Sequence, residues 1–189
     1  YKEACESLLK FQNNVTKKPK FMCVICGYNE NIVKDKETGI YIDDFYVNKA
    51  SSNFLYDVIE TYGGCKKFYN DFYMNFVCPL GIVRVNSKDN EVNCNYYENK
   101  KLMMSLYDFI VEILKMQIEF NIDRSICYCI GSGENYKFLC KINEEFNFFD
   151  KIIPLEHPRF IMQYNSKNKD YYLEKYLNAL RENIDKTDD

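Results

Sequence analysis

Apolar runs short enough for strands alternate along this chain with amphipathic patterns long enough for helices, and this alternation limits the possible folds most. The predicted strands cover residues 21–26, 71–78, 125–130 and 152–155. The predicted helices cover residues 53–62, 102–114, 134–146 and 170–181, with a polar loop or hairpin at 85–95. Strands joined by crossover helices form parallel sheets that are covered on both faces. The sequence therefore predicts an α/β fold, a three-layer α/β/α sandwich around a central four-stranded parallel sheet.

Size and composition predict one domain. A chain of 189 residues with 47% apolar content can bury one good core. We expect a single domain over residues 1–184 and a frayed acidic tail at 185–189. No apolar run approaches 18 residues, and the start has neither the basic nor the apolar region of a signal peptide. These features predict an intracellular protein, in the cytoplasm or the nucleoid or nucleus, with no membrane partner.

The nine cysteines suggest a metal site or disulfides, but their spacing argues against both. Cys23 and Cys26 lie at an odd offset on one predicted strand, so their thiols point to opposite faces. Cys127 and Cys129 share a face, yet no second pair follows at zinc-like spacing and the chain has one histidine. We expect reduced, mostly buried cysteines in a reducing compartment, with no metal and no cofactor.

Ligands of parallel α/β sheets bind beyond the carboxyl ends of the strands, so the loops that leave the strands hold the candidate site. His157 follows the last predicted strand. A neutral imidazole donates one hydrogen bond and its cation donates two, so this side chain can stabilise a developing anion near neutral pH. Asn29, after the first strand, could hold a water or a substrate carbonyl. The alternatives are a capping or packing histidine and an asparagine that stabilises its own turn.

The net charge of −3 argues against a protein that coats nucleic acid through bulk electrostatics. A local basic surface is still compatible with it, because Arg159, Lys167 and Lys169 follow the histidine. Such charges are alternatively part of a solvated face. The segment Gly131-Ser132-Gly133 precedes a predicted helix and could cradle a phosphate there, or it could serve tight packing. We assign no nucleotide cofactor to it.

Four segments in collinear order resemble the motifs of a known family. They are Gly27-Tyr28-Asn29, Thr38-Gly39-Ile40, Cys78-Pro79-Leu80-Gly81 and Leu155-Glu156-His157-Pro158-Arg159-Phe160-Ile161-Met162-Gln163-Tyr164. Together they look like the uracil-DNA glycosylase superfamily, and most like the bacterial branch of the single-strand-selective monofunctional (SMUG-type) enzymes. The resemblance implies a parallel four-stranded α/β/α sandwich. It also implies chemistry without a metal or an iron–sulfur cluster.

The resemblance implies roles for individual residues. Asn29 matches the asparagine that positions the attacking water, and His157 matches the histidine that donates to the uracil oxygen and stabilises the departing base. Residues 158–164 match the loop that wedges into DNA and holds the nucleotide flipped out, a step that costs a few kcal/mol of unstacking. The residues predicted to contact DNA are Ser132, Arg159, Phe160, Ile161, Met162, Lys167 and Lys169.

The chain departs from the family's pattern beside the chemistry. Glu30-Asn31 stand where family members have Pro-Gly, and Ile42 replaces the aromatic residue that stacks on the flipped base. Phe76 occupies the position of a uracil-reading asparagine, with Asn75 one residue earlier, and a shift of one residue on a strand reverses the face. The predicted base-binding residues are Ile42, Asn75 and Phe76.

Two functions remain open from the sequence. The favoured one is a monofunctional DNA glycosylase that removes uracil or a related damaged base from single- or double-stranded DNA in base excision repair. The alternative is a catalytically weakened member of the same fold that acts as a DNA-binding or protein-interaction subunit, with protein partners unknown. A small α/β hydrolase or nucleotide-binding protein would need a nucleophile elbow or a phosphate loop, and the chain has neither.

Overall fold

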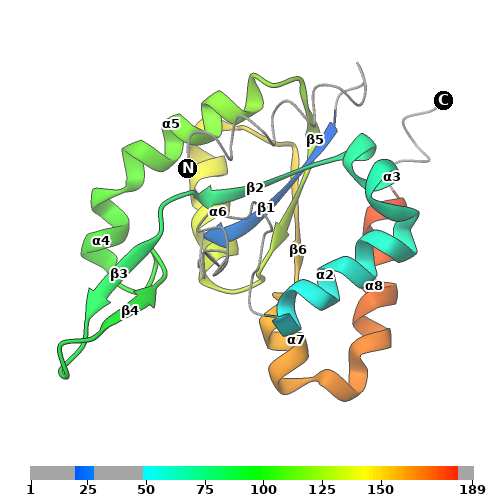
Figure 1. Cartoon of the computed structure of the whole chain (residues 1–189). Coiled ribbons are helices and arrows are strands. Elements are labelled where there is room, and N and C mark those ends of the chain that lie inside the picture. The colour runs from blue at the N-terminus through cyan, green and yellow to red at the C-terminus, as the bar shows by residue number, and fades with distance from the viewer. Residues whose placement is uncertain (1–19, 28–48, 183–189) are drawn as a thin grey trace, which may run out of the picture. The chain divides into compact units, whose positions relative to one another are not determined.

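The computed structural model describes residues 20–27 and 49–182 of the chain (Figure 1). These residues form two compact units. The sheet unit comprises residues 20–27 and 73–155, and the helical unit comprises residues 49–72 and 156–182. Within the described ranges no helix is long and apolar enough to span a membrane. The single domain over 1–184 with a tail at 185–189 stays a prediction.

The sheet unit is built on four strands in the order β2-β1-β5-β6 (Figure 1). Their bounds are β1 Lys20–Gly27, β2 Phe72–Cys78, β5 Ile122–Ile130 and β6 Lys151–Leu155. Strand β5 pairs in parallel with both β1 and β6, with Cys129 opposite Val24 on one side and Pro154 on the other. Proline lacks the N–H that a ladder needs, and β6 accommodates Pro154 because it is an edge strand.

The centre of the sheet consists of apolar side chains and thiols. Every residue of β5 from Ile126 to Ile130 is buried, as expected for a central strand of a parallel sheet. Cys23 and Cys127 are buried and free, and burial raises the pKa of both thiols, so they stay protonated. Five of the seven described cysteines are buried, in agreement with the prediction of mostly buried cysteines, whereas Cys65 is exposed and Cys140 is half-buried. Their reduced state stays a prediction, and Cys5 and the side chain of Cys26 lie outside the described residues.

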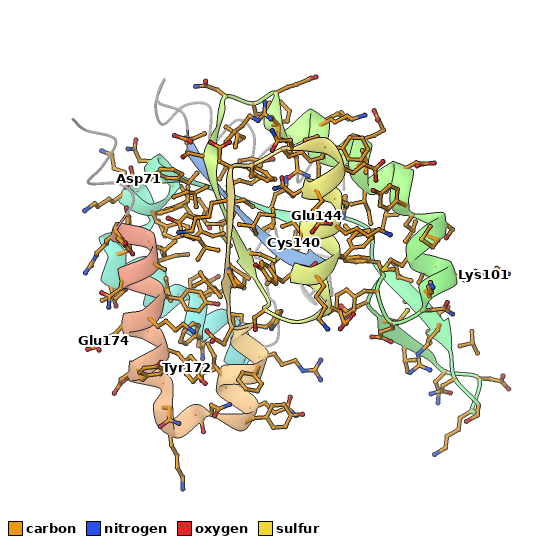
Figure 2. The ribbon with its side chains drawn as sticks, turned by 180° about the vertical axis from the view of Figure 1, so that it is seen from behind. Asp71, Lys101, Cys140, Glu144, Tyr172 and Glu174 are labelled. Carbon is orange, nitrogen blue, oxygen red and sulfur yellow. The ribbon has the colours of Figure 1, made fainter. Side chains whose placement is uncertain are left out.

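Helices α5 (Tyr107–Ile118) and α6 (Glu134–Phe146) both contact β5. Figure 2 views the sheet from behind, with α6 and its Cys140 and Glu144 in front. The predicted hairpin forms as β3 (Ile82–Val85) and β4 (Glu91–Cys94).

The predicted helix at 102–114 is interrupted, because α4 (Lys100–Ser105) ends before Leu106 and α5 begins after it. The Ser105 hydroxyl donates to the Leu102 carbonyl at 2.8 Å, a contact that bends helices. Phe109, expected on the buried face, is 38% exposed, whereas Ile110 and Leu114 are fully buried.

The helical unit comprises α2 (Lys49–Tyr62), α3 (Gly64–Asp71), α7 (Pro158–Tyr164), the short 3-10 helix η1 (Ser166–Asn168) and α8 (Lys169–Arg181). Helix α2 contacts both α7 and α8. The rings of Tyr62, Phe68 and Phe72 pack together with centroids 5.0–5.7 Å apart.

Helix α3 was not predicted, because a double glycine usually ends helical structure. Gly63 does end α2, with a φ of 139°, but the chain re-enters a helix at once. The burial of Phe68 between two aromatic rings of the same unit stabilises this eight-residue helix.

Helix α5 provides a test of the core. Leu114 is fully buried, so Leu114→Ala should lower the free energy of unfolding by about 2–5 kcal/mol through lost transfer free energy and a cavity. The matched control is Met116→Ala on the same helix, where the side chain is 56% exposed and the expected change is within about 0.5 kcal/mol. Urea denaturation measures both, and equal effects would contradict the packing of α5.

Candidate active site

His157 lies two residues beyond the end of β6 and caps the N-terminus of α7. Its Nδ1 accepts the backbone N–H of Arg159 at 3.0 Å, and Pro158 occupies the first helical position, where no N–H is needed. An Nδ1 that accepts a hydrogen bond carries no proton, so the neutral imidazole holds its proton on Nε2. The capping role and a donor role are therefore compatible, because they use opposite ring nitrogens.

The charge state of His157 follows from its surroundings. Burial and then the neighbouring Arg159 guanidinium lower the pKa of the imidazole from the ordinary 6.5 to about 4. At neutral pH the side chain is therefore an uncharged hydrogen-bond donor. The sequence left open whether it donates as a cation or as a neutral ring, and the structure favours the neutral ring.

The residues after His157 form the helix α7, where the sequence predicted a wedge-like loop. Arg159 and Phe160 are exposed, with Phe160 at 45%, and Met162 is half-buried. Ile161 is fully buried and anchors the helix, so its side chain is not on the surface that DNA can reach in this structure. The exposed apolar surface of α7 is therefore smaller than the predicted wedge, because it lacks Ile161 and retains Phe160.

A second exposed ring lies beside Phe160. Tyr164 is one helical turn further along α7 and 71% exposed, and the two ring centroids are 6.2 Å apart. Tyr164 is the last residue of the predicted wedge segment, and no separate role was predicted for it. Its spacing of four residues from Phe160 would place both rings on one helix face once α7 is known.

The three predicted basic residues differ in how free their charges are to contact phosphate. Arg159 donates from Nε to Gln163 Oε1 at 3.3 Å, and Lys167 is exposed on η1. Lys169 forms an ion pair with Asp57 of α2 at 2.5 Å, so its charge is partly neutralised within the protein. Arg159 and Lys167 are therefore the stronger candidates for phosphate contacts.

In the sheet unit, a glycine-rich turn connects the end of β5 to α6. The Gly131 N–H donates to the Leu155 carbonyl at 2.7 Å and so ties the ends of β5 and β6, with a φ of 123° at Gly131 that favours glycine. Ser132 and Gly133 are exposed. Ser132 is thus free of the core, as a phosphate-contacting residue must be.

A buried polar network, which the sequence did not suggest, begins directly after this turn. Asn135 is 2% exposed, accepts the Tyr96 hydroxyl at 2.6 Å and donates to Cys129 Sγ at 3.3 Å. Because a buried amide is costly when unpaired, these contacts fix the first turn of α6.

The predicted base-binding residues on β2 are engaged within the strand. Asn75 Nδ2 donates to the Tyr73 hydroxyl at 2.6 Å, and Asn75 Oδ1 accepts the Phe76 N–H at 2.8 Å. Both polar groups of the Asn75 amide are therefore used locally. Phe76 is half-buried and offers no polar side-chain atom to a base.

Asn29 and Ile42 lie outside the described residues, as do Glu30 and Asn31, so their roles stay predictions. In the part of the chain that the structure describes, no three histidine, cysteine or acidic side chains gather as a metal site.

Similarity to a known protein family identifies the superfamily of this chain. The Uracil DNA glycosylase superfamily model matches residues 14–181. The chain belongs to the uracil-DNA glycosylase superfamily. Among solved structures, the crystal structure of wild-type SMUG2 from Pedobacter heparinus is similar to this chain, with 31% sequence identity and a TM-score of 0.80. The match covers 93% of this chain and 81% of that chain, and no curated protein matches.

These likenesses confirm the predicted family and the fold class, an α/β fold with a central four-stranded parallel sheet flanked by helices. As a member of this superfamily, the chain has a DNA glycosylase function of the uracil-DNA glycosylase type. The roles of His157 and of the exposed residues of α7 in that function stay predictions.

The chain has one histidine, so the charge state of His157 can be measured directly. The imidazole should titrate near pH 4 in the folded protein and near 6.5 in urea, by NMR of histidine-labelled protein. Because the folded pKa is the lower one, the neutral ring contributes full stability above pH 6.5, and this contribution is lost as the pH falls towards 4. His157→Gln should remove that part of the pH dependence. A folded-state midpoint at or above 6.5 would contradict the neutral, half-buried donor.

Proposed function

We propose that this chain is a monofunctional DNA glycosylase that hydrolyses the N-glycosidic bond of uracil, or of a related damaged base, after the nucleotide is flipped out of DNA in base excision repair. The observation that carries the proposal is the neutral His157, whose Nδ1 is held by Arg159 so that Nε2–H is the donor. Family membership and the likeness to SMUG2 support this choice of chemistry.

Breaking the N-glycosidic bond transfers its electron pair to the base, which departs as an anion. A preorganised hydrogen bond from His157 Nε2 to a base oxygen stabilises this developing charge, and removing one such donor typically costs 10²- to 10³-fold in rate. Asn29 positions the water that adds to the sugar carbon C1′. The water loses a proton, the base gains one from solvent, and an abasic site remains in the DNA.

The face of α7 supports DNA as the partner. Six aromatic side chains of the described residues are exposed: Tyr56, Phe109, Phe120, Phe160, Tyr164 and Tyr171. All except Phe160 and Tyr164 have an acidic residue next to them in the chain, at Asp57, Asp108, Glu119 and Asp170 respectively. From His157 to Lys169 there are three basic residues and no acidic one. Exposed rings in a basic setting suit an apolar wedge and stacking against nucleobases.

Base release tests the proposed chemistry. His157→Ala should slow uracil release from single- and double-stranded oligonucleotides by about 10²-fold or more, because the anionic base loses its donor. Alkali-cleavable strand breaks measure the reaction. The control is Glu174→Ala on α8, since Figure 2 shows Glu174 pointing outward from the helix, on the side opposite Tyr172. An unchanged rate in a folded His157→Ala protein would remove the histidine from the mechanism.

The second candidate, a catalytically weakened binding subunit, is favoured by Glu30, Asn31 and Ile42. A carboxylate near the water site repels phosphate, and Ile42 has no ring to stack on a base. If the wild-type protein releases no uracil at high concentration but binds DNA that contains an abasic-site analogue, this candidate replaces the first.

The wedge is tested by binding. Phe160→Ala should weaken binding to DNA with an abasic-site analogue about tenfold, because the ring fills the space left by the flipped nucleotide. Phe109→Ala removes an exposed ring beside Asp108 on α5 and should leave binding unchanged. Fluorescence anisotropy at fixed salt compares the two. Equal affinities for both variants would place the wedge elsewhere in the chain.

A further inference from the structure

The residue directly before His157 is bound to α8 at two atoms. The backbone carbonyl of Glu156 accepts the Tyr176 hydroxyl, and Glu156 Oε1 accepts from Lys175 Nζ at 2.5 Å. Both donors are consecutive residues of α8, 19 and 20 positions further along the chain. No spacing rule connects them to the histidine, so the sequence did not suggest the contact.

Tyr176 is itself immobilised. Its side chain is 1% exposed, and its ring packs edge-on against Phe54 of α2 with centroids 5.2 Å apart. Because the ring is held in place, the position of the Tyr176 hydroxyl oxygen is held as well. Tyr176 thus connects the α2–α8 core of the helical unit to the Glu156 carbonyl.

The carbonyl that Tyr176 binds belongs to the peptide unit that leads into His157. Because a peptide unit is planar, a fixed Glu156 oxygen also fixes the direction of the His157 N–H and Cα. On the other side, the imidazole is held by the Arg159 N–H at Nδ1. The backbone before His157 and the ring of His157 are therefore each held by a separate hydrogen bond.

The ion pair adds little to stability by itself. Glu156 and Lys175 side chains are 21% and 41% exposed, a setting in which such pairs contribute modestly. In addition, Glu156 Oε2 is buried and has no hydrogen-bond partner among the residues that the structure describes, which costs free energy. The ion pair therefore contributes little to the free energy of unfolding, and the main effect of the contacts of Glu156 with α8 is to position the backbone before His157.

We infer that α8 positions His157 through Glu156, with Tyr176 and Lys175 as positioning residues for the histidine. The effect on catalysis rests on the proposed function, since a donor stabilises a departing base only when it is held close to the productive geometry. The effect on the imidazole itself does not depend on that function.

The test is Tyr176→Phe, which keeps the ring and removes the hydroxyl. We expect kcat for uracil release to fall about tenfold with KM unchanged, because DNA contacts remain while the donor is misplaced. The ¹⁵N resonances of the single imidazole should shift in the same variant. The matched control is Tyr62→Phe, which removes a buried phenol's 2.7 Å hydrogen bond to Asp71 in the same unit and should change neither kcat nor the imidazole signals.

Wild-type kcat and wild-type imidazole resonances in a folded Tyr176→Phe protein would overturn the inference. If that variant does not fold, Lys175→Met decides instead, with the same expected shift of the imidazole signals and the same meaning if none occurs. If the wild-type protein releases no base, the proposed function fails, and the NMR comparison of Tyr176→Phe with Tyr62→Phe still decides whether α8 positions His157.

Discussion

The hydrogen bond from the Arg159 N–H to His157 Nδ1 is the interaction on which the described site depends. It ends the extended segment after β6, begins α7 and selects the tautomer with its proton on Nε2. Protonation of the ring would require Nδ1 to donate, which would break the cap and bring a second positive charge near Arg159. The local fold and the charge state of the imidazole therefore stabilise each other.

A neutral donor suits the departure of an anionic base. A cationic imidazole would attract the phosphates of any nucleic acid and would lose its charge near physiological pH. In the proposed mechanism, the half-buried ring of His157 offers one directed N–H over the whole neutral range, and the exposed Arg159 and Lys167 supply the positive charges for phosphate contact. In this proposal, base stabilisation and DNA attraction thus belong to different side chains.

Much of the fold could be predicted from the sequence, because hydrophobic periodicity determines which segments cross the sheet. The bounds of α6 are those predicted, and β1, β5, β6 and α8 differ by a few residues at most. Helices α3 and α7 could not be predicted in the same way. Helix α3 depends on the packing of Phe68 between rings from other segments, and α7 is capped by a histidine side chain in place of the usual capping residues.

The candidate site was predictable in part. A family motif identified His157 and its neighbours, since those residues are contiguous in the chain. The burial of Ile161, the ion pair of Lys169 with Asp57 and the local use of the Asn75 amide depend on partners that no pattern reveals. The contacts of Glu156 with α8 belong to the same class, because they connect residues that are distant in sequence and share no periodicity.

Pro154 has a consequence beyond its tolerance in β6. The outer strand of an open sheet exposes unpaired backbone groups that can recruit a strand from another molecule and start aggregation. Pro154, the fourth residue of the five-residue β6, removes one N–H from a strand that is already short, and charged Lys151 stands at its start. This border of the sheet is thereby a poor template for intermolecular strand addition, which protects a chain whose interior is rich in β-forming, apolar segments.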